Sequence, residues 1–228
     1  MTSLIDPYDL ASVADCRPEG GSVIEMHAHS SDRSLDSGVR ADVLVAQTAK
    51  RGLDGVCLTE HNAIWHPDHT KELEDRHEVA VLPAMELGTD SGHVLVFGLE
   101  HYRPQMLLLE HLRPIVKSEG AVMVLAHPMR AFDGPRPSWN DFPLWFEGVE
   151  VINGDHSDGE NGYMDRQTRS MGLAAVGGSD AHSYQAVGRV ATAFANKIRT
   201  IDDIVEGIRA GHTRAVDFRP RPPDDSPK

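Results

Sequence analysis

The 228-residue chain has only two cysteines, Cys16 and Cys57, too few for the disulfide framework of a small secreted domain. It also has no run that approaches the roughly 20 apolar residues a membrane-spanning helix needs. Its start, MTSLIDPYDL, lacks the basic and apolar regions of a signal peptide. These absences predict a cytoplasmic protein that does not interact with a membrane.

Positive charge is scarce: 22 lysines and arginines face 35 aspartates and glutamates, which gives a formal net charge of -13. Long nucleic acids are normally bound by a basic surface, so a long nucleic acid is not expected as a partner. Bound metal can offset carboxylates locally. A small phosphorylated metabolite or a nucleotide therefore remains open as a partner.

Apolar, strand-like runs alternate with helical patterns over residues 21–217, a length that fits one domain. SVIEMHA, DGVCLTE and AVMVLAHP are typical of strands, and ADVLVAQTAKRG and TIDDIVEGIRAG of helices. This order predicts an α/β domain with parallel strands joined by helical crossovers, either an open sheet or, as we prefer, a barrel. Residues 1–20 are expected to form a lead-in segment, and residues 218–228 a flexible, proline-rich tail.

Residues that can bind metal stand at the ends of the apolar runs. These residues are His27 and His29, Glu60 and His61, Glu86, His127, and Asp180 and His182. In a strand the side-chain period is two, so His27 and His29 leave the same face. The carboxyl ends of parallel strands open onto one face of an α/β fold, so we expect these side chains to converge there.

The donor types in this set favour certain metals and certain roles. Glu86 offers two oxygens and could bridge two cations, and His93 could reach it from the connection that follows. Histidine with carboxylate, and without thiolate, suits zinc, manganese or iron rather than a structural zinc site. The sequence therefore predicts a metal centre.

Seven stretches extend this pattern over most of the chain. HAHS, SLDSG, TEHN, PAMELGTDSGHVLVFG, AHPMR, VEVING and GGSDAH occur in this order between residues 23 and 195. Together they resemble the PHP domain family, named for polymerase and histidinol phosphatase. The resemblance implies a distorted (β/α)7 barrel with two or three divalent ions, in most members a metal-dependent phosphoesterase.

Carried over to this chain, the resemblance implies three sets of ligands. The first set is His27, His29, Glu86 and Asp180, and the second is Glu86, His93 and His127. The third is His61, His182 and an aspartate after His29, for which we prefer Asp36 to Asp32. In TEHN, Glu60 stands where the family usually has aspartate, so the role of Glu60 is open.

The implied activity is hydrolysis of a phosphate monoester or a short nucleotide phosphoester by a metal-activated hydroxide. Divalent ions lower the pKa of bound water from roughly 15.7 to roughly 7 and clamp the phosphoryl oxygens. Arg130 is implied to bind phosphate oxygens, which its planar guanidinium suits, although pairing with an acidic neighbour is the alternative. Asn153 could bind substrate or support a ligand, or it could form an ordinary turn with Gly154.

Two other functions stay open. An amidohydrolase-like enzyme that cleaves C–N bonds also starts from a His-x-His strand, but its site often includes a carboxylated lysine. The lysines of this chain, at positions 50, 71, 117, 197 and 228, fall in helices, near loops or in the tail. The other alternative is a non-catalytic metal-binding scaffold. His66 and His69 in WHPDH fit either a substrate entrance or a solvated loop.

Overall fold

Nine strands form a single sheet in the computed structural model, which describes residues 13–132 and 134–220. The strand order is β7-β6-β5-β4-β3-β2-β1-β8-β9. The strands are β1 (Ser22–Ala28), β2 (Gly55–His61), β3 (Ala80–Thr89), β4 (Gly92–Phe97), β5 (Val122–Leu125), β6 (Gly148–Asn153), β7 (Ala174–Gly178), β8 (Val190–Phe194) and β9 (Thr213–Asp217). Because β7 packs against both β1 and β9, the sheet curls into a nearly closed barrel. The predicted distorted α/β barrel is confirmed.

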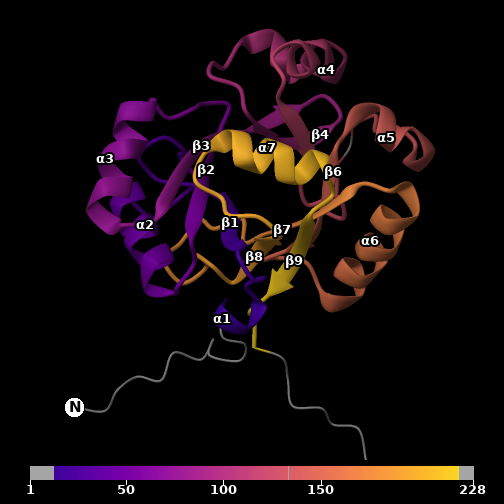
Figure 1. Ribbon diagram of the computed structural model, residues 1–228. Helices are drawn as coiled ribbons and strands as arrows, with labels where there is room; N and C mark the ends of the chain where they lie inside the picture. The colour runs from indigo at the N-terminus through magenta and orange to yellow at the C-terminus, as the bar shows by residue number, and fades with distance from the viewer. Residues whose placement is uncertain (1–12, 133, 221–228) are drawn as a thin grey trace, which may run out of the picture.

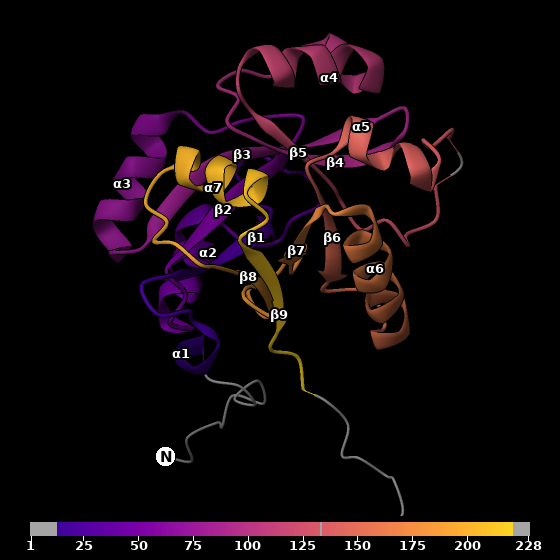
Figure 2. The same ribbon diagram turned by 45° about the vertical axis from the view of Figure 1, so that its right-hand side comes forward.

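Helices cover the outside of this barrel (Figures 1 and 2). They are α1 (Val13–Cys16), α2 (Ala41–Lys50), α3 (Pro67–His77), α4 (Leu109–Ser118), α5 (Phe142–Trp145), α6 (Asp158–Met171) and α7 (Ile201–Arg209), with 3-10 turns η1 (Pro104–Leu107) and η2 (Trp139–Asp141). Local sequence fixes their ends: Ser157 and Glu160 form a capping box at the start of α6. Gly172 ends α6 in the left-handed conformation, with φ 68°.

The barrel interior is apolar, and α7 closes one end of it. Ile204 and Ile208 of α7 pack in the same cluster as Ile24 and Met26 of β1. The backbone N–H of Ile198, just before α7, donates to Ser22 Oγ at the start of β1. The helix therefore covers the end at which β1 begins, and the opposite end is left for the polar residues.

The strand directions differ from the predicted all-parallel arrangement. Strands β1, β2 and β3 run parallel, as do β5, β6 and β7, but β4, β8 and β9 pair antiparallel with their neighbours. Only Asp90 and Ser91 separate β3 from β4, and a connection this short permits a hairpin but no crossover. The sheet also has nine strands, where the resemblance implied about seven.

The predicted end segments lie partly outside the described residues. Residues 1–12 of the expected lead-in and residues 221–228 of the expected tail belong to that part of the chain. Within the described part, Cys16 packs against the core cluster that contains Phe218. The side chain of Arg17 forms an ion pair of 2.8 Å with Asp54. No helix among residues 13–132 and 134–220 has the length and apolar character to cross a membrane.

Candidate metal centre

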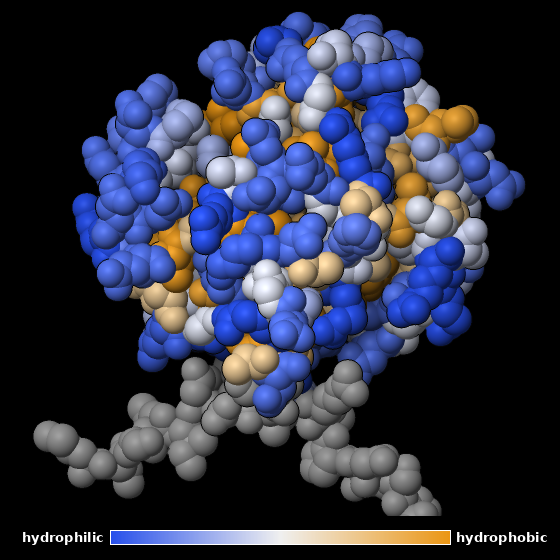
Figure 3. All heavy atoms as spheres, viewed as in Figure 1, coloured by the Kyte–Doolittle hydropathy of each residue, from blue (hydrophilic) through white to orange (hydrophobic). Residues whose placement is uncertain are grey.

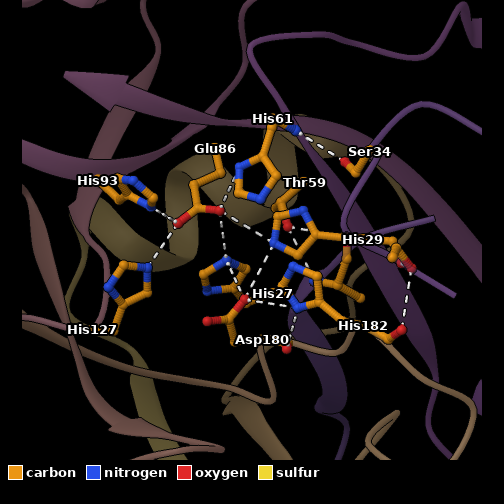
Figure 4. A network of polar contacts seen from close by, with 12 residues as sticks. His27, His29, Ser34, Thr59, His61, Glu86, His93, His127, Asp180 and His182 are labelled. Atoms are coloured by element: carbon orange, nitrogen blue, oxygen red, sulfur yellow. Dashed lines mark hydrogen bonds and ion pairs between the residues drawn. The ribbon is translucent and has the colours of Figure 1, made fainter. Parts of the chain in front are cut away.

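The predicted ligands reach one end of the barrel from different segments, and Figure 4 shows all of them except Asp36. His27 is the penultimate residue of β1, His61 the last of β2, and Glu86 and His93 face each other across the β3–β4 hairpin. His127 follows β5, and Asp180 and His182 follow β7. The predicted ligands therefore lie at the end of the barrel opposite α7.

These side chains form three overlapping groups whose donor atoms all lie within 4.8 Å of one another. The groups are His27, His29, Glu86 and Asp180; Glu86, His93 and His127; and His29, His61 and His182. The first two are the sets that the resemblance implied. The third group has His29 alongside His61 and His182, and the predicted aspartate is not part of it.

The carboxylate of Glu86 lies at the junction of the groups. Its Oε1 is 2.8 Å from His93 Nδ1 and 2.8 Å from His127 Nε2. Its Oε2 lies 3.1 to 3.3 Å from ring nitrogens of three further histidines, His61, His29 and His27. Each oxygen thus serves a different set of imidazoles, which is the arrangement expected of a bridging carboxylate.

Several buried polar atoms in this cluster have no hydrogen-bond partner among the described residues. Four of them point to a shared ligand: His27 Nε2, His29 Nε2, Glu86 Oε2 and Asp180 Oδ1. Buried polar atoms are normally paired, because an unpaired one costs free energy. A divalent cation would satisfy all four atoms, and imidazole with carboxylate suits zinc, manganese or iron. The donor set therefore fits the predicted metals.

The ionisation of the two central carboxylates also suits a cation. Burial opposes the charged form of Glu86, but the neighbouring histidines, His27 first, outweigh it and hold the pKa of Glu86 well below its usual value. Burial likewise opposes ionisation of Asp180, and His27 and His29 lower its pKa strongly. Both carboxylates therefore carry a negative charge at neutral pH.

The structure distinguishes between the two aspartates considered for the third set. Asp36 Oδ2 lies 3.0 Å from His61 Nε2 and 3.3 Å from His182 Nε2. Asp32 instead accepts a hydrogen bond of 2.7 Å from the backbone N–H of Ala41, at the start of α2. The geometry favours Asp36 as the ligand.

The two predicted substrate-binding residues lie in different surroundings. Arg130 is half-exposed, and its Nη2 donates to Asp180 Oδ2 at 2.6 Å, so it borders the cluster and also pairs with an acid. Asn153 is fully buried, and its amide donates to Glu150 Oε2 while its Oδ1 accepts from the N–H of Asp155. Of the roles considered for Asn153, support of a ligand and the turn agree with this burial, and direct substrate contact does not.

Comparisons with known proteins give the same family as the sequence motifs. Residues 160–213 match the family model PHP_C, described as PHP-associated. Over 113 residues, 48% of this chain, the sequence is 32% identical to an uncharacterized protein of Methanocaldococcus jannaschii, and the match spans 64% of that relative. The family-model match supports a PHP domain family protein.

Solved structures share the fold of this chain at low sequence identity. A two-domain Bacteroides vulgatus protein, with a domain predicted to be a PHP-like metal-dependent phosphoesterase, has a TM-score of 0.67 at 20% identity, covering 88% of this chain and 66% of that one. A Bifidobacterium adolescentis protein whose name proposes a metal-dependent phosphoesterase has a TM-score of 0.63 at 16% identity, covering 82% and 96%. An amidohydrolase from Chromobacterium violaceum has a TM-score of 0.62 at 16% identity, covering 86% and 98%.

Two buried carboxylates support the predicted ligands, and the sequence analysis did not identify either. Glu150 accepts from His27 Nδ1 at 2.9 Å and from the backbone N–H of His127 at 2.7 Å. Glu25 accepts from the backbone N–H groups of His27, Ser179 and Gly188. Their signal was a single glutamate inside an otherwise apolar strand, in SVIEMHA and in VEVIN.

Glu60, whose role the motif left open, connects two loops, the one between β1 and α2 and the one between β2 and α3. Its carboxylate accepts from the Ser30 hydroxyl, the Ser34 hydroxyl and the Trp65 indole N–H at 2.5 to 2.8 Å. Ser30 follows His29, and Ser34 precedes Asp36 by two residues. Glu60 therefore holds the loop that presents Asp36, and it is not among the grouped metal donors.

Backbone strain is concentrated at the centre. His127 and Asp180 have positive φ values of 26° and 50°, although neither is glycine. Such conformations cost about 1–3 kcal/mol each and persist only where the surrounding structure enforces them. The hydrogen bond from His127 N–H to Glu150 and the pairing of Ala181 with Ala28 supply that enforcement.

Replacing Gly178 by alanine should destabilise the protein by about 1–3 kcal/mol, because the added methyl group would overpack the core at this position. A Cβ on Gly178 would lie 2.6 Å from Glu150 Oε1 and would also clash with the His27 side chain. Urea-induced unfolding of the metal-free protein measures the effect. Gly159→Ala is the control, since a Cβ at Gly159 meets nothing within 4 Å. Equal stability of the two variants would contradict this packing.

Proposed function

We propose that this PHP domain is a metal-dependent hydrolase that cleaves phosphate esters, acting on a phosphate monoester or a short nucleotide phosphoester. The observation that carries the proposal is the set of three donor groups joined through Glu86, bordered by the arginine Arg130. The fold neighbours whose names contain metal-dependent phosphoesterase support it as an analogy.

The ligand assignment is part of the proposal. Two or three ions of zinc, manganese or iron would be held by His27, His29, Asp36, His61, Glu86, His93, His127, Asp180 and His182. When bound, such ions supply positive charge to a phosphoryl group and lower the pKa of water. The protein fixes their positions through buried side chains, since the side chains of His27, His29 and Glu86 are at most 1% exposed.

Substrate would enter where the donors are partly exposed. The side chains of His61, His93 and His182 are 26%, 37% and 31% exposed, and they surround the buried ligands. Arg130 is anchored through Nη2 on Asp180, and its Nε and Nη1 groups have no hydrogen-bond partner among the described residues. These groups would donate to phosphoryl oxygens and orient the ester at the mouth of the site.

Cleavage of a C–N bond is the second candidate, because one fold neighbour is named an amidohydrolase. A carboxylated lysine, frequent in such sites, has no counterpart in this cluster within residues 13–132 and 134–220. The Nζ atoms of Lys50, Lys71 and Lys197 donate hydrogen bonds to Tyr184, Glu74 and Asp54, respectively. None of these three partners is a grouped donor. The donor set therefore favours the phosphoesterase.

Metal analysis and product release from one purified sample test the proposal. We expect two or three equivalents of metal, and release of inorganic phosphate from a panel of phosphate esters that stops after chelation and returns with Mn²⁺ or Zn²⁺. Release of ammonia from amides without phosphate release would favour the second candidate. Bound metal with neither product would favour a scaffold.

A further inference from the structure

An arginine lies over the ring of a tryptophan in the loops that carry two predicted ligands. The Cζ atom of Arg33 is 4.7 Å from the centroid of the Trp65 ring. Arg33 lies in the loop between β1 and α2, three residues before Asp36, and Trp65 lies four residues after His61. The same two loops therefore carry two predicted ligands and this stacked pair, which we call the shelf.

The orientation of the shelf is fixed by the network that supports the ligand loops. The indole N–H of Trp65 donates to Glu60 Oε1 at 2.8 Å. The same carboxylate accepts from Ser34, whose hydroxyl oxygen also accepts from the backbone N–H of His61 at 3.2 Å. Trp65 is bonded to Glu60 and His61 to Ser34, and Glu60 and Ser34 are bonded to each other. A group stacked on the shelf would therefore have a defined position relative to the metal centre.

The charge of Arg33 is not neutralised within the described residues. Its side chain is exposed and forms no ion pair or hydrogen bond with residues 13–132 or 134–220. The nearest acids in the sequence are engaged elsewhere, Asp32 with the N–H of Ala41 and Asp36 with His61. In a chain of net charge -13, an arginine without a carboxylate partner is available to a ligand.

A groove of about 680 Å³ begins at the shelf and provides room for such a ligand. Its lining includes the apolar residues Ile64, Pro83 and Leu99, together with His101, the carboxylate residue Glu100, and Ile201 and Asp202 at the start of α7. Figure 3 shows hydrophobic side chains at the surface between α3 and α4.

We propose that the shelf binds the nucleobase of a nucleotide substrate whose phosphate lies at the metal centre, a proposal that rests on the proposed function. An indole and a guanidinium both stack on planar heterocycles, and arginine adds attraction for the electron-rich base and the nearby phosphate. The groove combines an apolar lining with polar groups, which suits a base that has flat faces and a hydrogen-bonding edge.

Kinetics with two substrates that share the reacting phosphate test the shelf. Adenosine 5′-monophosphate has a base, and ribose 5-phosphate lacks one. We expect Arg33→Ala and Trp65→Leu to lower kcat/KM for the nucleotide by about 10-fold, mainly through KM, and Arg33→Ala to leave ribose 5-phosphate unchanged. Arg33→Ala leaves the Trp65–Glu60 hydrogen bond in place, so it separates stacking from damage to the loop. Arg166→Ala, an exposed arginine of α6, is the matched control.

Binding without turnover gives an independent readout. We expect adenosine 5′-monophosphate to quench the tryptophan fluorescence of the full chain after its metal has been removed with a chelator. This quenching should be lost in Trp65→Leu but kept in Trp139→Leu. Trp139 is exposed on η2 and contacts Phe142 and Tyr163 instead.

The two measurements separate the shelf from the proposed function. Quenching through Trp65 without phosphate release from any ester supports the shelf and overturns the phosphoesterase. Hydrolysis of both substrates with equal losses in the shelf variants, and no quenching through Trp65, overturns the shelf and leaves the phosphoesterase intact.

Discussion

Glu86→Gln should lower kcat/KM for phosphate ester hydrolysis by at least about 100-fold and reduce the amount of metal bound. Mutating groups that merely support a metal ligand costs about 10–100-fold, so loss of a bridging carboxylate should cost more. The amide keeps the size of the side chain but has one acceptor oxygen and no charge. One of the two sets of histidines would then lose its carboxylate oxygen. These sets are His93 with His127, and His61 with His29 and His27.

Elemental analysis and steady-state kinetics on metal-saturated samples measure both effects. Glu147→Gln is the control, because that carboxylate pairs with Arg113 outside the cluster and should retain full activity. Full metal content and activity in Glu86→Gln would show that the cluster is not the metal centre.

Glu150→Gln should weaken metal binding by about 10–100-fold, although Glu150 is not itself a predicted ligand. The carboxylate accepts from His27 Nδ1 and so keeps the proton on that nitrogen, which leaves Nε2 free to bind a cation. A glutamine NH₂ at this position would oppose the Nδ1–H and shift the proton to Nε2. If the amide turned over, its NH₂ would face the backbone N–H of His127 instead.

Competition with a chelator measures the affinity, and ¹⁵N NMR of the histidine rings reports the tautomer of His27. The free energy of unfolding of the metal-free variant should also be lower than that of the unmutated protein by about 1–3 kcal/mol, because a buried donor loses its acceptor. Glu160→Gln, a surface carboxylate in α6, is the control. An unchanged tautomer together with unchanged affinity would remove Glu150 from the support of the centre.

The clustering of these side chains could be predicted from the sequence because strand ends in a parallel sheet converge whatever the details of the barrel. The positions of His27, His127 and Asp180 at the ends of apolar runs were enough to predict that they lie together. The choice between Asp36 and Asp32 depends on the path of a loop, which no periodicity describes. The hydrogen bond from the N–H of Ala41 to Asp32 favours Asp36.

The supporting groups and the strand directions were harder to predict. Glu25 and Glu150 lie within strands, and only the three-dimensional structure brings Glu150 to His27 from 123 residues away. The hairpin between β3 and β4 was hidden because both runs are almost entirely buried, and such runs look the same in parallel and antiparallel sheets. Asn153 was ambiguous because asparagine before glycine is common in turns.

The β3–β4 hairpin also bears on the order in which the centre assembles. Glu86 and His93 are seven residues apart on paired strands, so they can meet on the time scale of hairpin closure, about 1–10 μs. Asp180 reaches His27 only after the chain has closed a loop of more than 150 residues, a slow step for non-local contacts. A cation captured early by the hairpin would therefore act as a folding nucleus around which the rest of the barrel is built.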